Sequence, residues 1–361
     1  MTAQQQKRIR WWLWTGVLLI SVMVVVGGVT RLTDSGLSMS DWSLIMGAIP
    51  PMNEADWMAV FERYKEFPHY QQLNAGMSLV EFKTIFFWEY LHRLLGRLIG
   101  LVFLIPFGFF WYRGYFDYIM LKRAWILFGL GALQGGVGWF MVKSGLVDLP
   151  YVSHYRLALH LVLAMVLMGC CIWYALDLSQ RSTMHSSPIN TSSLKRWSYV
   201  LLLLFSAQVI WGALTAGLDA GYMYNTFPAM NGTWLPRNAW ALQPAVVNLA
   251  ENPGMVQWTH RILGTALGVV VVGFWWTNYK TVATGQLKQK AGWLLAVVLL
   301  QYLLGIATVI SQVHIVMGVL HQAGALIVLF FWGLYHHELM QAGSTHKKAE
   351  YASKVLSSKI R

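Results

Sequence analysis

The chain has 361 residues, of which 56% are hydrophobic and only 12% carry a charge. Soluble domains carry roughly 25% charged residues, so this composition excludes an ordinary soluble protein and indicates one that is integral to a membrane. The formal net charge of +12 could suggest a nucleic-acid partner, but 17 of the 27 basic residues fall in segments on one side of the predicted spans, which argues against one.

Eight apolar stretches approach the roughly 20 residues that a helix needs to cross the hydrocarbon core of a bilayer. The spans are expected near residues 11–29, 94–112, 124–142, 157–176, 198–217, 259–277, 291–310 and 315–334. The first stretch follows a very short basic segment and lacks a small-residue cleavage site, so we interpret it as a retained span and not as a signal peptide. The predicted fold class is an all-α integral membrane protein with eight transmembrane helices.

Basic residues gather before the first span, between spans two and three, four and five, and six and seven, and in the tail. The positive-inside rule places such segments in the cytoplasm. Both termini are therefore expected to be cytoplasmic.

The chain also repeats itself. Four residues recur with the same spacing in both halves: Gly27, Thr30, Asp34 and Gly36 match Gly212, Thr215, Asp219 and Gly221. Gln134 and Gly138 likewise match Gln301 and Gly305. Four spans per half give both halves the same orientation, so the pattern predicts two tandem, pseudo-symmetric four-helix bundles related by an axis along the membrane normal. The predicted parts are a bundle at 1–178, a cytoplasmic linker at 179–196, a bundle at 197–340 and a basic cytoplasmic tail at 341–361.

Two long segments, residues 30–88 and 218–256, follow the first span of each half and are rich in aromatic residues. Trp and Tyr suit the membrane interface, so these segments are expected to lie on the mouths of the bundles. Covering a site and anchoring the chain in the bilayer are both compatible with the pattern. Cys170 and Cys171 are adjacent on one helix and point apart, so no disulfide is expected.

A His-Arg-x-Leu-Gly motif occurs twice, at residues 92–96 and 260–264, and each half has one later intramembrane histidine. The pairs are His92 with His160 and His260 with His321. All four are expected near the outer ends of their spans, where each pair could ligate one haem iron. A lone intramembrane histidine is more often a hydrogen-bonded core residue, but four at matching positions favour ligands.

Zinc is less favoured, because no cysteine or carboxylate completes a tetrahedral set in either half. Other histidines in loops or at cytoplasmic ends, among them His69, His336 and His337, are not expected to take part in the site.

Arg93 and Arg261 follow the first histidine of each pair and are candidates to bind haem propionates. Snorkelling toward the interface is the alternative. Glu89 precedes His92 by three residues and shares its helix face, whereas the second half has the neutral Gln257 at the matching position. This difference suggests chemistry at the first pair only. A solvated acid near the start of a helix is the competing interpretation of Glu89.

The sequence resembles haem A synthases of the proteobacterial and mitochondrial type across nearly its whole length. The resemblance is carried by GGVTRLTDSGLSMSDW at 27–42, WEYLHRLLGR at 88–97, His160, QWTHRILG at 257–264 and LHQAGA at 320–325. One departure from some bacterial members is the absence of paired loop cysteines, which excludes a redox role for loop thiols.

The resemblance implies that the C8 methyl of haem O is hydroxylated twice, giving a gem-diol that loses water to a formyl group, for terminal oxidase biogenesis. It implies that His260 and His321 hold a haem b cofactor. It also implies that His92 and His160 bracket the substrate iron and that Glu89 is catalytic.

The location implied is the bacterial inner membrane. The implied partners are haem O, membrane lipid and a ferredoxin-like or quinol electron donor, with association with haem O synthase and self-association as further expectations.

Two alternatives stay open. A dihaem electron carrier of the cytochrome b type shares the paired histidines but gives no reason for Glu89 in only one half. A haem transporter would usually have broken helices near the midplane, whereas these histidines lie toward one face.

Overall fold

A computed structural model describes residues 1–39, 49–146, 150–179, 191–282 and 285–359, with side chains described up to residue 342. Its longer helices are α1 (Ala3–Leu32), α4 (Leu79–Tyr112), α5 (Tyr118–Lys143), α6 (His154–Asp177), α7 (Ser192–Gly217), α9 (Pro253–Thr281), α10 (Gln286–Ile310) and α11 (Ile315–Lys359). The shorter ones are α2 (Glu54–Lys65), α3 (Pro68–Leu73), η1 (Ala220–Tyr222), η2 (Ala245–Val247) and α8 (Asn248–Glu251).

Eight helices of the described chain are long and apolar enough to cross a membrane, which confirms the predicted number of spans and the all-α class. Several are longer than their apolar stretch. Helix α4 begins at Leu79, well before the apolar stretch, because the Ser78 side chain accepts from the Glu81 amide and the Glu81 carboxylate accepts from the Ser78 amide. This capping box satisfies the first free amides of the helix outside the predicted span.

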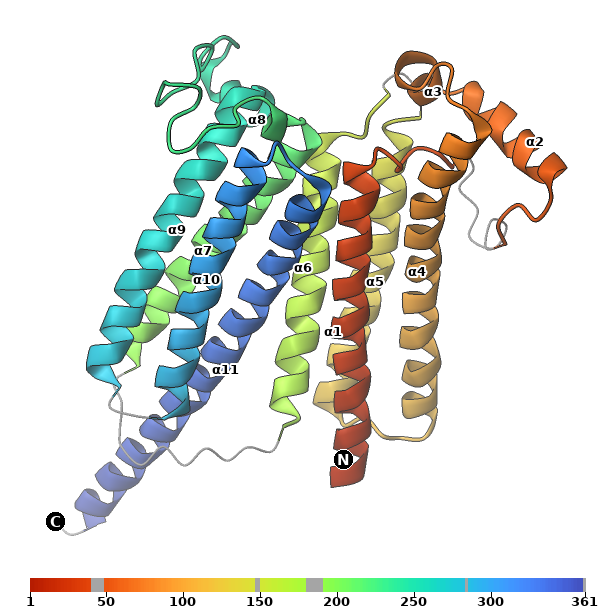
Figure 1. The fold of residues 1–361 in the computed structure, drawn as a ribbon. Helices are drawn as coiled ribbons and strands as arrows, with labels where there is room; N and C mark the ends of the chain where they lie inside the picture. Colours follow the sequence, from red (N-terminus) through yellow and green to blue (C-terminus); the bar gives the residue numbers. More distant parts are fainter. Residues whose placement is uncertain (40–48, 147–149, 180–190, 283–284, 360–361) are drawn as a thin grey trace.

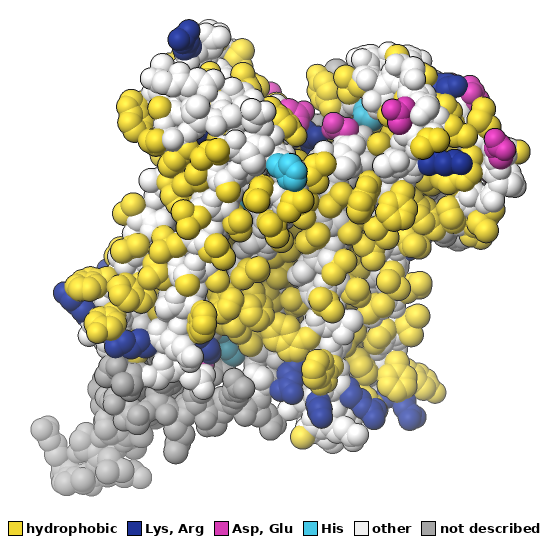
Figure 2. Space-filling view, in the orientation of Figure 1, with side chains coloured by type: hydrophobic (Ala, Val, Ile, Leu, Met, Phe, Trp, Pro, Cys, Tyr) yellow, Lys and Arg dark blue, Asp and Glu magenta, His cyan; other side chains and the backbone are white. Residues whose placement is uncertain are grey.

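The eight long helices stand in two groups of four (Figure 1). Helices α1, α4, α5 and α6 lie on one side, and α7, α9, α10 and α11 on the other. Helices α2, α3 and α8 lie at one end of the molecule, called the loop end here, while both chain termini lie at the opposite, terminal end. On the face shown in Figure 2, lysine and arginine side chains gather at the terminal end and acidic ones lie at the loop end. The division at residues 178 and 197 stays a prediction, because residues 180–190 of the expected linker lie outside the described residues.

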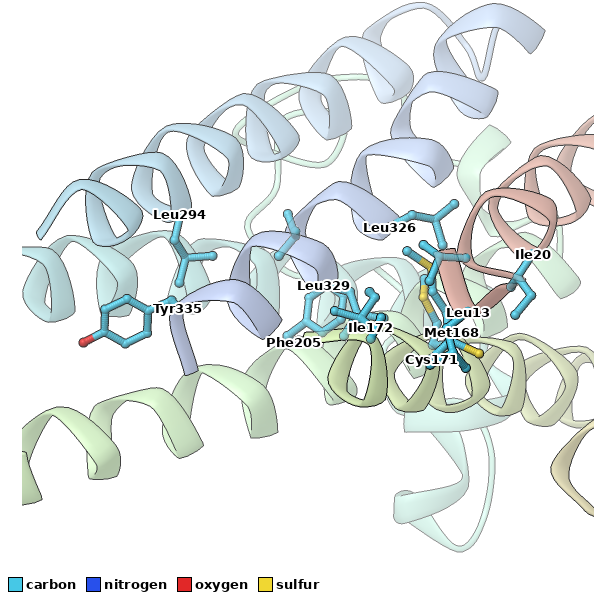
Figure 3. Close-up of a cluster of buried hydrophobic side chains, with 14 of the residues drawn as sticks. Leu13, Ile20, Met168, Cys171, Ile172, Phe205, Leu294, Leu326, Leu329 and Tyr335 are labelled. Atoms are coloured by element: carbon cyan, nitrogen blue, oxygen red, sulfur yellow. The ribbon is translucent and has the colours of Figure 1, made fainter. Parts of the chain in front are cut away.

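The largest apolar cluster runs between the two groups of helices (Figure 3). It contains Leu13 and Ile20 of α1, Ile172 of α6, Phe205 of α7 and Leu329 of α11, each less than a tenth exposed. The central helices therefore bury side chains against one another, while the outer helices face lipid. Cys170 and Cys171 are both free thiols, as expected.

Ion pairs and hydrogen bonds join the two groups of helices at both ends. At the loop end, the Arg31 guanidinium bonds Asp34 at 3.0 Å and reaches across to Asp219 at 2.6 Å. At the terminal end, Asp177 bonds His337 at 2.7 Å and Arg123 at 2.6 Å. His336 and His337 lie near the end of the last span, where both are buried.

Candidate functional site

The four candidate histidines lie inside four different long helices: His92 on α4, His160 on α6, His260 on α9 and His321 on α11. The last three lie within the first turns of their helices, toward the loop end, as the sequence predicts. His92 lies deeper in its own helix, because the capping box adds several turns to α4 before the apolar stretch begins.

The two histidines of the second half face each other. The ring centroids of His260 and His321 are 6.3 Å apart and their planes are nearly perpendicular, at 87°. Two imidazoles on one metal ion need bonds of about 2 Å each plus about 1 Å from each nitrogen to its ring centre, which gives about 6 Å between centroids. The observed separation therefore suits an iron held between the two rings.

Each of the four histidines packs on a glycine of a neighbouring helix. The pairs are Gly27 with His92, Gly138 with His160, Gly212 with His260 and Gly305 with His321. A Cβ at any of these glycines would come within 2.9–3.1 Å of the imidazole. A larger residue at Gly138 or Gly305 would force the ring to shift, and one at Gly27 or Gly212 would require the ring to move by a few tenths of an ångström.

A glutamine one helical turn before the glycine contacts three of the four rings. The side-chain amide nitrogens of Gln134 and Gln208 lie 3.3 Å from a ring nitrogen of His160 and His260, and that of Gln301 lies 3.1 Å from His321. Gln134 and Gln301 also donate to the backbone carbonyl of the same histidine. Hydrogen bonds of this kind set the orientation of a metal-ligating imidazole.

These contacts define a Gln-x-x-x-Gly motif on the helix opposite each of three histidines. The glutamine and glycine are four residues apart and so share one helix face. The sequence repeat predicts two of these motifs, at Gln134 and Gln301, but not the third. Gln208 and Gly212 complete it on α7, and the matching pair on α1 is Met23 and Gly27. The fourth copy has the same spacing but carries Met23 in place of the glutamine, so it does not match the motif.

Two buried ring nitrogens that lack a hydrogen-bond partner in the described chain are suited to bind a metal ion. Nδ1 of His160 and Nδ1 of His260 are buried and have no hydrogen-bond partner among the described residues. Each of these rings thus has one nitrogen beside a glutamine amide and one nitrogen available. Because a buried polar atom without a partner is costly, this arrangement fits a group that binds the second nitrogen. The described residues contain no cluster of three histidines, cysteines or acids, so two imidazoles per iron fit the donor set better than a zinc site does.

Glu89 is buried, with only 3% of its surface exposed. One carboxylate oxygen pairs with Arg93 at 2.6 Å, and the other accepts from the Ser38 hydroxyl and the Met39 amide, both at 2.8 Å. The interpretation of Glu89 as a solvated acid is wrong, because the residue is buried well inside α4 and both its oxygens are bonded. A buried, fully bonded carboxylate of this kind is typical of functional sites and of structural ion pairs alike.

Gln257 is equally buried in the second half, at 1% exposure. Its amide donates to the carbonyl of Tyr224 at 3.1 Å and to that of Gly221 at 3.4 Å. Both residues therefore tie the segment after the preceding long helix to the helix that carries the histidine. The donor and acceptor roles are reversed between the halves. In the first half the Glu89 carboxylate accepts from the segment, and in the second half the Gln257 amide donates to backbone carbonyls of the segment.

Arg93 and Arg261 bond the same two segments. Arg93 donates to the Met39 carbonyl at 2.8 Å besides pairing with Glu89. Arg261 donates to the carbonyls of Thr226 and Tyr224, both at 2.7 Å. The Arg93 side chain is only 11% exposed, so it does not snorkel toward solvent. Both arginines hold the loop-end segments against the helices that carry the histidines.

Comparison with known proteins gives a consistent result. The family model described as cytochrome oxidase assembly protein, COX15-CtaA, matches residues 10–332. A curated relative named heme A synthase from Rhodospirillum centenum is 42% identical over 92% of this chain and 89% of its own length. Relatives of the same name from Nitrosospira multiformis and Parvibaculum lavamentivorans are 44% and 45% identical, over 92% and 89% of this chain and 94% and 91% of their own lengths.

Proposed function

The chain belongs to the COX15-CtaA family of cytochrome oxidase assembly proteins, and on that premise we propose that it is a haem A synthase. It oxidises the C8 methyl group of haem O to a formyl group by successive hydroxylations. The names of the curated relatives support this activity. The paired intramembrane histidines support a haem substrate and a haem cofactor.

The two pairs of histidines have different roles in this proposal. His92 and His160 bind the iron of the substrate haem O, and His260 and His321 bind a haem b cofactor. The cofactor supplies electrons to the substrate site when it is bound. The facing rings of His260 and His321 support the second assignment, because a resident cofactor calls for a pair that is already arranged to receive it.

The observation that carries the proposal is the buried carboxylate of Glu89 one helical turn from His92, with Gln257 at the matching place in the other half. A carboxylate held in a low-dielectric setting can take up a proton or stabilise positive charge that develops on the substrate. The amide of Gln257 can do neither. Chemistry at the first pair and electron transfer at the second follow from this difference.

Arg93 has two roles in the proposed reaction. It pairs with Glu89 at 2.6 Å, which holds the carboxylate on the histidine face of α4. The guanidinium groups of Arg93 and Arg261 would also be suited to bind haem propionates. The loop-end segments that both arginines hold then exclude water from above the two sites.

The proposed location is the bacterial inner membrane, with both termini in the cytoplasm. The gathering of lysine and arginine side chains at the terminal end supports this orientation. The loop end, the histidines and Glu89 then lie toward the outer leaflet, from which lipid-soluble haem O enters. A ferredoxin-like protein or a quinol is the proposed class of electron donor, and association with haem O synthase or with a second copy would assist delivery of the substrate.

The test is chemical identification of the haems made. The chain is produced together with haem O synthase in a host that lacks haem A, and the pigments are extracted and separated by chromatography. Haem A in the extract is the expected result. Haem O and haem b without haem A would refute the enzyme and favour a dihaem electron carrier or a haem transporter.

A further inference from the structure

His92 differs from the other three histidines in how its ring is held. His160, His260 and His321 each have a glutamine amide beside the ring. At the matching place on α1, Met23 takes the position of the glutamine, and its methyl group lies against Gly96, where the Gln208 amide lies against Gly264. Among the described residues, no side-chain amide is hydrogen-bonded to the ring of His92.

The orientation of the ring differs too. At the other three sites, a Cβ added to the glycine would meet the imidazole first at Cε1, at 2.9–3.0 Å. At His92 it would meet Nε2 first, at 3.1 Å, and then Cδ2. The Nε2 edge of His92 is thus turned toward α1. Two independent features, the missing amide and the turned ring, therefore single out the same histidine.

We propose that His92 is the exchangeable axial ligand of the substrate haem, and that Met23 is the positioning residue that leaves its ring free to move. This inference rests on the proposed function and deepens it. When His92 releases the iron, the iron–nitrogen bond breaks, its electron pair stays on the imidazole, and one coordination position opens. No oxidant or reductant takes part in this exchange.

The opened position lies on the side of the haem that faces α4. Glu89 is three residues before His92 and so shares its face of the helix. Release of His92 thus places a vacant iron position beside the one buried carboxylate of the site. His160, held at both its ring and its backbone carbonyl by Gln134, keeps the iron in place from the other side. His260 and His321 both have a glutamine, as suits a cofactor that only transfers electrons.

The test uses carbon monoxide as a probe of vacant positions on ferrous haem in the purified, haem-loaded protein. Met23→Gln restores the motif, so its amide should hold His92 and slow carbon monoxide binding at the first haem by about fivefold, the factor that corresponds to one net hydrogen bond. The low-spin fraction of that haem should rise. Met23→Leu adds no amide and should keep the wild-type binding rate.

The reciprocal change is Gln208→Met, which removes the amide beside His260. It should allow carbon monoxide to bind a second haem that does not bind it in the wild type, and this variant decides the question if Met23→Gln does not fold. Carbon monoxide binding that is unchanged in both variants, or changed as much by Met23→Leu as by Met23→Gln, would overturn the inference. Failure of the proposed function is seen separately, as a lack of haem A in a wild-type protein whose haems still differ in carbon monoxide binding.

Discussion

Glu89 and Arg93 form a buried ion pair across one turn of α4, with 2.6 Å between the carboxylate oxygen and the guanidinium nitrogen. Arg93 also donates to the Met39 carbonyl, and the second Glu89 oxygen accepts from the Met39 amide. The pair therefore fixes the segment after α1 to the helix that carries His92. Because a buried charge without its partner is strongly destabilising, the two residues must be considered together.

Replacing Glu89 with glutamine should abolish haem A formation while leaving haem at the second pair. The change keeps the shape of the side chain but removes the negative charge and one of the two oxygens that accept from Arg93, Ser38 and Met39. The rate should therefore fall by on the order of 10²-fold or more, the usual contribution of a general acid or base. Haem A yield and total haem content measure the two effects. Glu81→Gln is the matched control, since Glu81 lies on the same helix and its capping bonds can be kept by an amide. Wild-type haem A in Glu89→Gln would contradict the assignment.

Adding a methyl group at Gly305 should weaken haem binding at the second pair. A Cβ there would lie 2.9 Å from Cε1 of His321, so the ring or its helix must shift, at a cost of about 1–3 kcal/mol. The visible spectrum of the low-spin haem and its retention during purification report the shift. Gly268→Ala is the control, because no atom lies within 4 Å of a Cβ at that position. Equal haem retention in the two variants would show that close packing on the ring is not needed.

Arg31→Gln should lower the thermal stability of the protein in detergent. Arg31 joins Asp34 to Asp219 across the two groups of helices. Since both acids are more than half exposed, each ion pair should contribute at most about 1 kcal/mol. The loss should shrink at high salt, because exposed charges are screened. Arg113→Gln, at an exposed position of the terminal end, is the control. Equal melting temperatures for the two variants would show that the Arg31 ion pairs do not stabilise the protein.

Acidification should loosen the segment that contains α2 and α3. His69 is 3% exposed and its Nδ1 lies 2.7 Å from the Tyr64 hydroxyl. Burial lowers the pKa of His69 below its ordinary 6.5, and the charges of Asp34 and Glu89 oppose this only in part. The unfolded segment therefore binds a proton more readily than the folded one, so its contribution to stability is complete above pH 6.5 and is lost as the pH falls below that value.

Hydrogen exchange of residues 54–73 at pH 7.5 and pH 5.5 measures this loss. His69→Gln removes the titrating group. In this variant the exchange rates of residues 54–73, corrected for intrinsic exchange, should not differ between the two pH values. Equal protection of the wild-type segment at both pH values would contradict the expected shift.

Most of the transmembrane architecture could be predicted from the sequence, since each span is a continuous apolar stretch. The helix starts could not, as α4 illustrates: Glu81 and Lys83 interrupt the apolar pattern, yet the capping box at Ser78 begins the helix there. Likewise, the burial of His336 and His337 could not be predicted, because they lie at the end of the apolar stretch. They are buried because Ser198 and Asp177, from other helices, bond them.

The proximity of His260 and His321 could be predicted because the chain carries two copies of the histidine pattern. Their partners could not, because contacts such as Gln208 with His260 depend on how α7 and α9 are rotated about their axes. The same limit applies to Glu89: its spacing from His92 indicated a shared helix face, but its bonds to Ser38 and Met39 come from a distant segment.

The proposed function requires the two histidine pairs to bind different haems. It is tested most directly by identifying the haems that copurify with two double variants, each produced together with haem O synthase. The protein with His92→Ala and His160→Ala should retain haem b and contain neither haem O nor haem A. The protein with His260→Ala and His321→Ala should lose haem b, retain haem O and make no haem A. Haem O or haem A bound to the first variant, or the same mixture of haems in both, would contradict the account.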